Sequence, residues 1–207
     1  QARISSSEIR RGKASEETLN RYIETSRNIY DLPLYIDETP AIAISTLSNR
    51  ARRIKRLFGL KLIVVDYIQL MRTNSNRMDG RVQEISEITQ GLKALAKELN
   101  VPVVALSQLS RAVEQRDDKI PQLSDLRESG SIEQDADVVV FVYREQYYLE
   151  KKEPKQGSIE HAEWQSKMSD IHGLANLIIG KHRHGSTGTV HVEFEGMFTK
   201  FKDLPKN

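Results

Sequence analysis

The 207-residue sequence contains no cysteine, so disulfide bonds and thiolate metal sites are excluded, which fits a protein of the reducing cytoplasm. Its apolar runs are far shorter than the roughly 20 residues that span a bilayer, so we expect no membrane association. Lys and Arg number 31 against 29 Asp and Glu, a net charge of +2. With charges so nearly balanced, any nucleic-acid site must depend on a local group of basic residues.

A second absence bears directly on function. The pattern G-x-x-x-x-G-K-[ST], whose backbone N–H groups hold nucleotide phosphates, occurs nowhere in the chain. The Gly-Lys-His string that starts at Gly180 does not fit this pattern. The sequence also begins at Gln1 rather than at Met, so we expect it to be a fragment of a longer protein.

Apolar periodicity predicts helices that alternate with strands. Helices are expected over 15–32, 45–58 and 81–100, and strands over 34–36, 61–66, 103–106, 138–143, 174–179 and 189–194. Early strands alternate with helices and late strands form a hairpin. This order predicts an α/β fold with a mostly parallel sheet flanked by helices and a C-terminal antiparallel hairpin. The length suits one domain, with the polar stretch 150–170 as a surface insertion.

Asp66 directly follows the apolar residues Leu-Ile-Val-Val and ends a predicted strand. A hard cation such as Mg²⁺ prefers oxygen ligands, so this carboxylate is a candidate to serve the metal directly or through a water. The alternative is an ordinary strand-end Asp that caps the following turn.

Gln108 ends the next predicted strand, in the string Ala-Leu-Ser-Gln. Its amide is a candidate to orient a water or to sense a γ-phosphate, and the alternative is a solvated side chain. Because Asp66 and Gln108 end consecutive strands, we expect them to be neighbours.

The string DLRESGSIEQ, residues 125–134, contains a predicted helix start. Ser131 and Gln134 have the spacing of a capping box, which gives Ser131 a structural role. A helix start also offers free N–H groups to a phosphate, Gly130 allows close approach, and Arg127 adds charge. A capped turn with a surface Arg–Glu pair is an equally good interpretation.

Lys181 and Arg183 project from a predicted strand end into a Gly-rich turn. Such a loop can present an arginine finger, a cation that neutralises charge on a phosphoryl group bound to a neighbouring subunit. The alternative is a solvated hairpin tip. A metal site at His182 and His184 lacks a convincing third ligand.

Four longer strings carry a family resemblance: LIVVDYIQLM, VVALSQLSRAVEQR, KIPQLSDLRESGSIEQDADVVVFVYR and IIGKHRHGSTGTVHVEFE. In order and spacing they resemble the C-terminal motor domain of the bacterial replicative DNA helicase of the DnaB type. The resemblance covers nearly the whole chain, and 150–170 is its least typical part. It implies a RecA-like P-loop ATPase core that uses ATP and Mg²⁺ and forms a homohexameric ring around single-stranded DNA. Primase and a helicase loader are the further partners it implies.

The resemblance also implies roles for single residues of the nucleotide site. Asp66 would be the Mg²⁺-associated Asp and Gln108 the γ-phosphate sensor. Lys181 and Arg183 would be the cationic pair that reaches into the next subunit's site. The family's N-terminal domain, linker, phosphate-binding loop, catalytic Glu and first strand precede the point where this sequence begins. We therefore expect a fold that is incomplete at its N-terminus and an isolated chain that hardly hydrolyses ATP.

Arg127, Glu128 and Gly130 would lie on the pore loop that contacts the DNA backbone. Contacts to phosphates carry no sequence information, which suits a motor that moves along any DNA.

Two other functions stay open at this point. A RecA-like recombination or regulatory ATPase shares the strand-end Asp, but we would not expect the string DLRESGSIEQDAD in it. A non-enzymatic module that binds primase or a helicase loader is favoured, for the isolated chain, by the missing phosphate-binding loop.

Overall fold

The structure is a computed structural model that describes residues 2–5, 10–12, 15–73 and 80–205, with the side chains of 127–129 outside the description. The chain divides into two compact units. The terminal unit comprises Gln1–Asp37, Arg144–Leu177 and Val190–Asn207, and the central unit comprises Glu38–Tyr143 and Ile178–Thr189. The expectation of one domain with a surface insertion stays a prediction.

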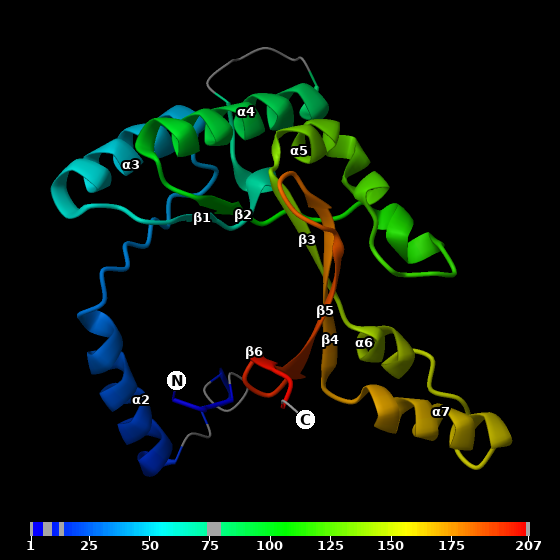
Figure 1. Cartoon of the computed structure of the whole chain (residues 1–207). Coiled ribbons are helices and arrows are strands. Elements are labelled where there is room, and N and C mark those ends of the chain that lie inside the picture. The colour runs from blue at the N-terminus through cyan, green and yellow to red at the C-terminus, as the bar shows by residue number, and fades with distance from the viewer. Residues whose placement is uncertain (1, 6–9, 13–14, 74–79, 206–207) are drawn as a thin grey trace. The chain divides into compact units, whose positions relative to one another are not determined.

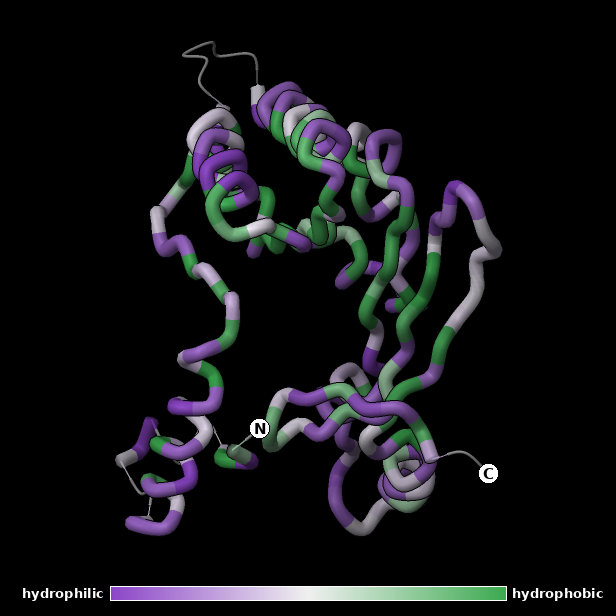
Figure 2. Tube along the Cα trace, turned by 60° about the vertical axis from the view of Figure 1, so that its left-hand side comes forward, coloured by the Kyte–Doolittle hydropathy of each residue, from purple (hydrophilic) through white to green (hydrophobic). Residues whose placement is uncertain are grey.

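Two helices, α3 (Ile44–Phe58) and α4 (Arg81–Leu99), lie side by side in the central unit (Figure 1). Both were predicted, and hydrophilic and hydrophobic residues alternate along them (Figure 2). Helix α3 ends at Gly59, whose φ of 75° is left-handed and whose N–H donates to the carbonyl oxygen of Lys55. Gly59 is thus the C-cap of α3, a position that glycine fills without steric cost.

Strands β1 (Ile63–Val65) and β2 (Val103–Ala105) pair in parallel, with Ile63 opposite Val103. Helix α4 is the crossover between them, as parallel pairing requires. The strand β1 and helix α4 bury a common core whose members are Val65, Ile68, Met71, Ile85, Ile88 and Leu92. Val64 points the other way and is 58% exposed, which follows from the two-residue period of a strand.

The central unit also contains a second, smaller core, to which η3 (Leu123–Ser129) and β3 (Val138–Tyr143) contribute. One 3-10 helix, η1 (Ile68–Leu70), lies between β1 and α4 in the chain. After β2 come, in chain order, the 3-10 helices η2 (Arg111–Gln115) and η3, helix α5 (Gly130–Asp135) and strand β3. Leu126, Val139 and Phe141 form this core. A Cβ on Gly180 would lie 2.6 Å from the Phe141 ring, so glycine is needed there for close packing.

The predicted capping role of Ser131 is wrong. The chain enters α5 at Gly130 directly from η3, so Ser131 lies inside a helix rather than before one. Its hydroxyl is buried and, among the described residues, has no hydrogen-bond partner. The capping box occurs one element earlier, where Gln122 and Asp125 cap the start of η3.

The terminal unit contains α2 (Glu16–Tyr30), α6 (Glu145–Glu150) and α7 (Ile159–Ile171). The hydroxyl of Ser15 accepts a hydrogen bond from the N–H of Thr18 at 3.2 Å, which confirms the predicted start of α2. All but the last residue of α7 lies in the segment 150–170. Trp164 of this helix donates from its indole N–H to the carbonyl oxygen of Leu149 at 2.8 Å.

Strands β4 (Leu174–His182) and β5 (Gly188–Glu195) run through both units. The strand order of their sheet is β3-β4-β5-β6, in which β6 (Lys200–Asp203) pairs antiparallel with β5. Strand β6 was not predicted, because Lys-Phe-Lys-Asp is short and rich in charge. The predicted strand at 34–36 is wrong, since these described residues have no regular structure and are exposed at all three positions.

We expect Ile88→Ala to lower the free energy of unfolding by about 3 kcal/mol, since truncation of a fully buried side chain leaves a cavity. Ile88 is 0% exposed. Val82→Ala on the same helix is the control, because Val82 is 57% exposed and its truncation should change stability by no more than about 0.5 kcal/mol. Urea unfolding measures both, and equal effects would contradict the assigned core.

Candidate functional site

Asp66 and Gln108 lie just beyond the carboxyl ends of β1 and β2. Pairing of Val65 with Ala105 is the last step of the ladder, and the N–H of Leu106 extends it by donating to the carbonyl oxygen of Val65 at 2.9 Å. Both strands therefore end at the same edge, as expected for a parallel pair. Asp66 and Gln108 are exposed there, and the peptide bond between Asp66 and Tyr67 is cis.

Gln69 joins the two strand ends, and sequence analysis did not find it. Its amide nitrogen donates to the hydroxyl of Ser107 at 2.9 Å and to the carbonyl oxygen of Gln108 at 3.3 Å. Its amide oxygen accepts from the N–H of Gln108 at 3.2 Å. The amide of Gln69 therefore binds both backbone polar groups of Gln108 and leaves the Gln108 side chain free to act.

Helix α4 begins at the same edge. The guanidinium of Arg81 donates to the carbonyl oxygen of Gln69 and forms an ion pair with Glu84. The carboxylates of Asp66 and Glu84, the amides of Gln69 and Gln108, and the guanidinium of Arg81 thus lie where β1 and β2 end and α4 begins. This set offers both acceptors and donors to a charged ligand.

The described residues contain no group of three or more His, Cys, Asp or Glu that could hold a metal ion by themselves. Mg²⁺ is usually held by one or two carboxylates, with phosphates and waters as its other ligands. The single exposed carboxylate of Asp66 fits that kind of site and does not fit a closed metal centre.

Lys181, near the end of β4, is bound within its own chain. Its ammonium group donates to the carbonyl oxygens of Glu133 at 2.5 Å and Gln134 at 3.4 Å. These carbonyls lie in the last turn of α5, where a cation is favourable.

Arg183 is placed differently, because its side chain is 61% exposed. Its backbone N–H donates to the carbonyl oxygen of Asp137 at 2.8 Å, and its guanidinium lies 3.5 Å from the Asp137 carboxylate. Asp137 also pairs with Lys93 of α4. The hydrogen bond from Lys93 is the main cause that holds the pKa of Asp137 below its ordinary value; burial opposes it, and Arg183 adds a smaller effect.

The predicted DNA-contacting residues are described only in part. The side chains of Arg127 and Glu128 lie outside the described residues. Gly130 begins α5, and a Cβ built on it would meet no described atom within 4 Å.

Comparison with known proteins assigns nearly the whole chain to one family. The family model of the DnaB-like helicase C terminal domain matches residues 1–203. The chain belongs to this family. It is 53% identical over 205 residues to the replicative DNA helicase DnaB of Rickettsia typhi, and the match covers 99% of this chain and 41% of that protein. The chain thus spans well under half the length of this relative.

Two solved structures are similar to this DnaB-like C-terminal domain. The ATPase domain of G40P superposes with a TM-score of 0.82 at 36% identity, over 99% of this chain and 67% of that one. A DnaB-like replicative helicase, described with its interactions with primase, gives 0.81 at 35% identity, over 99% and 46%. They confirm the predicted RecA-like ATPase fold. In the part of the DnaB-like domain that the structure describes, no helix is long and apolar enough to cross a membrane.

One feature of the sequence could have drawn attention to Gln69, although the pattern of apolar strands does not include it. Gln69 is the one polar side chain between Ile68 and Leu70, of which Ile68 is almost fully buried. Gln69 itself is half-buried, so a hydrogen bond within the chain is favourable for its amide, although the sequence does not say which partner it has.

We expect Gln69→Met to speed hydrogen exchange of the Gln108 amide about fivefold, since the loss of one hydrogen bond costs about 1 kcal/mol. Gln69→Glu should leave this amide protected, because Glu keeps the oxygen that accepts from it and loses only the donating N–H groups. Exchange followed by NMR or mass spectrometry tests both variants.

Gln90→Met is the matched control, because Gln90 is exposed on α4 and its amide donates to Ser86 of the same helix. Fast exchange at Gln108 in this control, or slow exchange in Gln69→Met, would contradict the bracing role of Gln69.

Proposed function

We propose that this chain is the motor part of a replicative DNA helicase, in which ATP hydrolysis drives movement along single-stranded DNA and unwinds duplex DNA at the fork. One observation supports this most directly. Asp66 and Gln108 extend from the ends of two paired parallel strands, and Gln69 bonds the backbone of Gln108 in place. Ligands of open α/β sheets bind at such carboxyl ends.

In this proposal Asp66 serves Mg²⁺ directly or through a water, and Gln108 contacts the γ-phosphate or the attacking water. Bound Mg²⁺ bridges phosphate oxygens and neutralises charge that develops during transfer. The exposure of both side chains supports access to a nucleotide. The phosphates need a further set of donors, which the 207 residues do not contain as a G-x-x-x-x-G-K-[ST] loop.

Arg183 is the cation we assign to the nucleotide of a neighbouring subunit, and Lys181 is its supporting partner. The exposed guanidinium of Arg183 supports this role, because it can meet a ligand outside its own chain. The bonds of Lys181 to α5 favour a role in holding the end of β4 until a neighbour displaces them. A ring of six copies would place each Arg183 beside the next nucleotide site.

We assign Arg127, Glu128 and Gly130 to the DNA backbone on the strength of the family resemblance. A Cβ built on Gly130 meets no described atom within 4 Å, which is compatible with a close approach of the strand there. Single-stranded DNA is the proposed substrate, and primase and a helicase loader are the proposed protein partners. The solved structure of a DnaB-like replicative helicase is described with its interactions with primase, which supports primase as a partner. Because replicating DNA is its proposed substrate, we place the protein in the cytoplasm.

ATP binding and turnover by the 207-residue chain, measured beside a protein of the relatives' full length that contains it, test the proposal. We expect a silent chain and a longer protein whose turnover rises with single-stranded DNA. Turnover by the chain itself would mean that the nucleotide site is built differently. If the longer protein neither binds nor hydrolyses ATP, the motor function is refuted. The alternative function, a non-enzymatic module that binds primase or a loader, is then favoured.

We expect Arg183→Ala in the full-length protein to abolish ATP turnover and to leave ATP binding within about twofold, because a finger residue acts on the transition state. Asp66→Ala should abolish turnover as well. A mixture of the two variants should regain turnover, because an interface can then combine an intact Asp66 from one subunit with an intact Arg183 from the other.

His184→Ala is the control for Arg183→Ala, because it alters an exposed side chain of the same turn. Its turnover should stay at the wild-type level. A mixture of the Asp66 and Arg183 variants that stays inactive would refute action across the subunit interface.

A further inference from the structure

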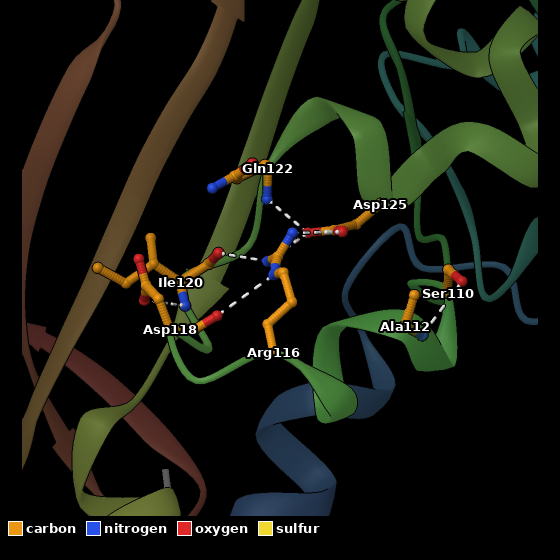
Figure 3. A network of polar contacts seen from close by, with 7 residues as sticks. All are labelled: Ser110, Ala112, Arg116, Asp118, Ile120, Gln122 and Asp125. Carbon is orange, nitrogen blue, oxygen red and sulfur yellow. Dashed lines mark hydrogen bonds and ion pairs between the residues drawn. The ribbon is translucent and has the colours of Figure 1, made fainter.

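The segment between β2 and α5 contains an ion pair to which the proposed function assigns no role. The guanidinium of Arg116 donates to both carboxylate oxygens of Asp125, at 2.9 and 3.0 Å (Figure 3). The Asp125 side chain is 4% exposed and the Arg116 side chain 31%. This is a two-pronged ion pair with one member buried, the strongest geometry available to these side chains.

Arg116 also shapes the loop that follows it. Its Nη2 donates to the carbonyl oxygen of Ile120 at 2.8 Å, and its Nε donates to that of Asp118 at 3.2 Å. Figure 3 shows the guanidinium between these carbonyls and Asp125. These four hydrogen bonds occupy most of its N–H groups, so the guanidinium is a poor candidate for a direct contact to DNA.

Asp125 is fixed through its backbone as well as its side chain. Its carboxylate accepts from the N–H of Gln122 at 2.7 Å, and its own N–H donates to the carbonyl oxygen of Gln122 at 2.9 Å. Its carbonyl oxygen accepts from the N–H of Ser110 at 3.0 Å. Ser110 follows Gln108 by two positions, so this bond ties Asp125 to the segment that follows β2.

A partly buried ion pair adds little net stability over an apolar pair of the same size, because both charges lose solvation. What the pair adds is a single arrangement in which both carboxylate oxygens of Asp125 and four N–H groups of Arg116 are hydrogen-bonded at once. Residues 126–130 follow directly, and they include the residues assigned to the DNA backbone.

We propose that Arg116 and Asp125 are positioning residues, which hold the start of η3 so that residues 127–130 can meet DNA phosphates. This inference rests on the proposed function, since it assumes that these residues contact single-stranded DNA. Neither Arg116 nor Asp125 touches DNA or nucleotide in this role. Their effect is on the affinity for DNA.

The test uses the full-length protein and an oligo-dT strand as the probe. Asp125→Asn and Arg116→Lys should each raise the strand concentration for half-maximal ATPase stimulation about tenfold, comparable with the loss of a phosphate contact. Turnover at saturating DNA and the KM for ATP should change far less. Such a split between affinity and turnover is not expected from general misfolding.

The sign of the Asp125→Asn effect separates positioning from simple electrostatics. Removal of a negative charge near a DNA site should tighten binding if charge alone mattered. Arg116→Lys keeps the charge but cannot form the two-pronged pair, so it should bind DNA like the wild type if Arg116 contacted a phosphate directly. Tighter or unchanged DNA binding in Asp125→Asn, or wild-type binding in Arg116→Lys, overturns the proposal.

A double variant distinguishes a loss of DNA binding from a loss of the fold. Arg116→Gln combined with Asp125→Asn removes both charges and leaves no uncompensated charge buried, and thermal melting checks that it is folded. It should weaken DNA binding no more than Asp125→Asn alone, because the two residues act as one unit. Additive losses would overturn the pairing.

Arg52→Lys is the matched control, because Arg52 forms a similar two-pronged pair with Glu98, at 2.6 and 2.8 Å, on the exposed faces of α3 and α4. It should leave DNA affinity unchanged, and an equal loss in this control would overturn a specific role for Arg116. If the wild-type protein does not bind the strand at all, the proposed function fails. If it binds and the variants match it, only the positioning role fails.

Discussion

The parallel pairing of β1 with β2 is the interaction on which the candidate site depends. A parallel pair requires a crossover, and α4 supplies it with a buried face that includes Ile85, Ile88 and Leu92. The same pairing brings two strand ends to one edge, with Asp66 after one and Gln108 after the other. Core packing and site geometry are therefore consequences of a single register.

The two cations at the end of β4 show how the local environment separates residues of similar chemistry. Lys181 and Arg183 are two positions apart, yet the first donates to the carbonyls of α5 and the second is largely exposed. Asp137 interacts with Arg183, but Lys93 is its stronger partner. Arg183 therefore shares its carboxylate partner with Lys93, and its own side chain stays largely exposed.

Most elements of the fold could be predicted, because their signals are local. The apolar period of α4, the left-handed Gly59 and the continuous apolar run of β3 each depend on neighbouring residues. The failures have a common cause: 34–36 has strand propensity without a strand beside it, and β6 is a strand only because β5 supplies its partner. The misplaced cap at Ser131 is similar, since only the structure reveals that η3 leads straight into α5.

The residues at the strand ends of the candidate site could be predicted from the sequence, but the residue that holds one of them in place could not. Asp66 and Gln108 are conspicuous because a polar residue follows an apolar strand. Gln69 acts on a residue 39 positions away, and its role requires two strand ends to be adjacent. Short patterns therefore find the groups proposed to face a ligand, whereas the residues that orient them become visible only when distant parts of the chain are brought together. A motor needs both, because a sensor or a DNA contact acts only from a fixed position.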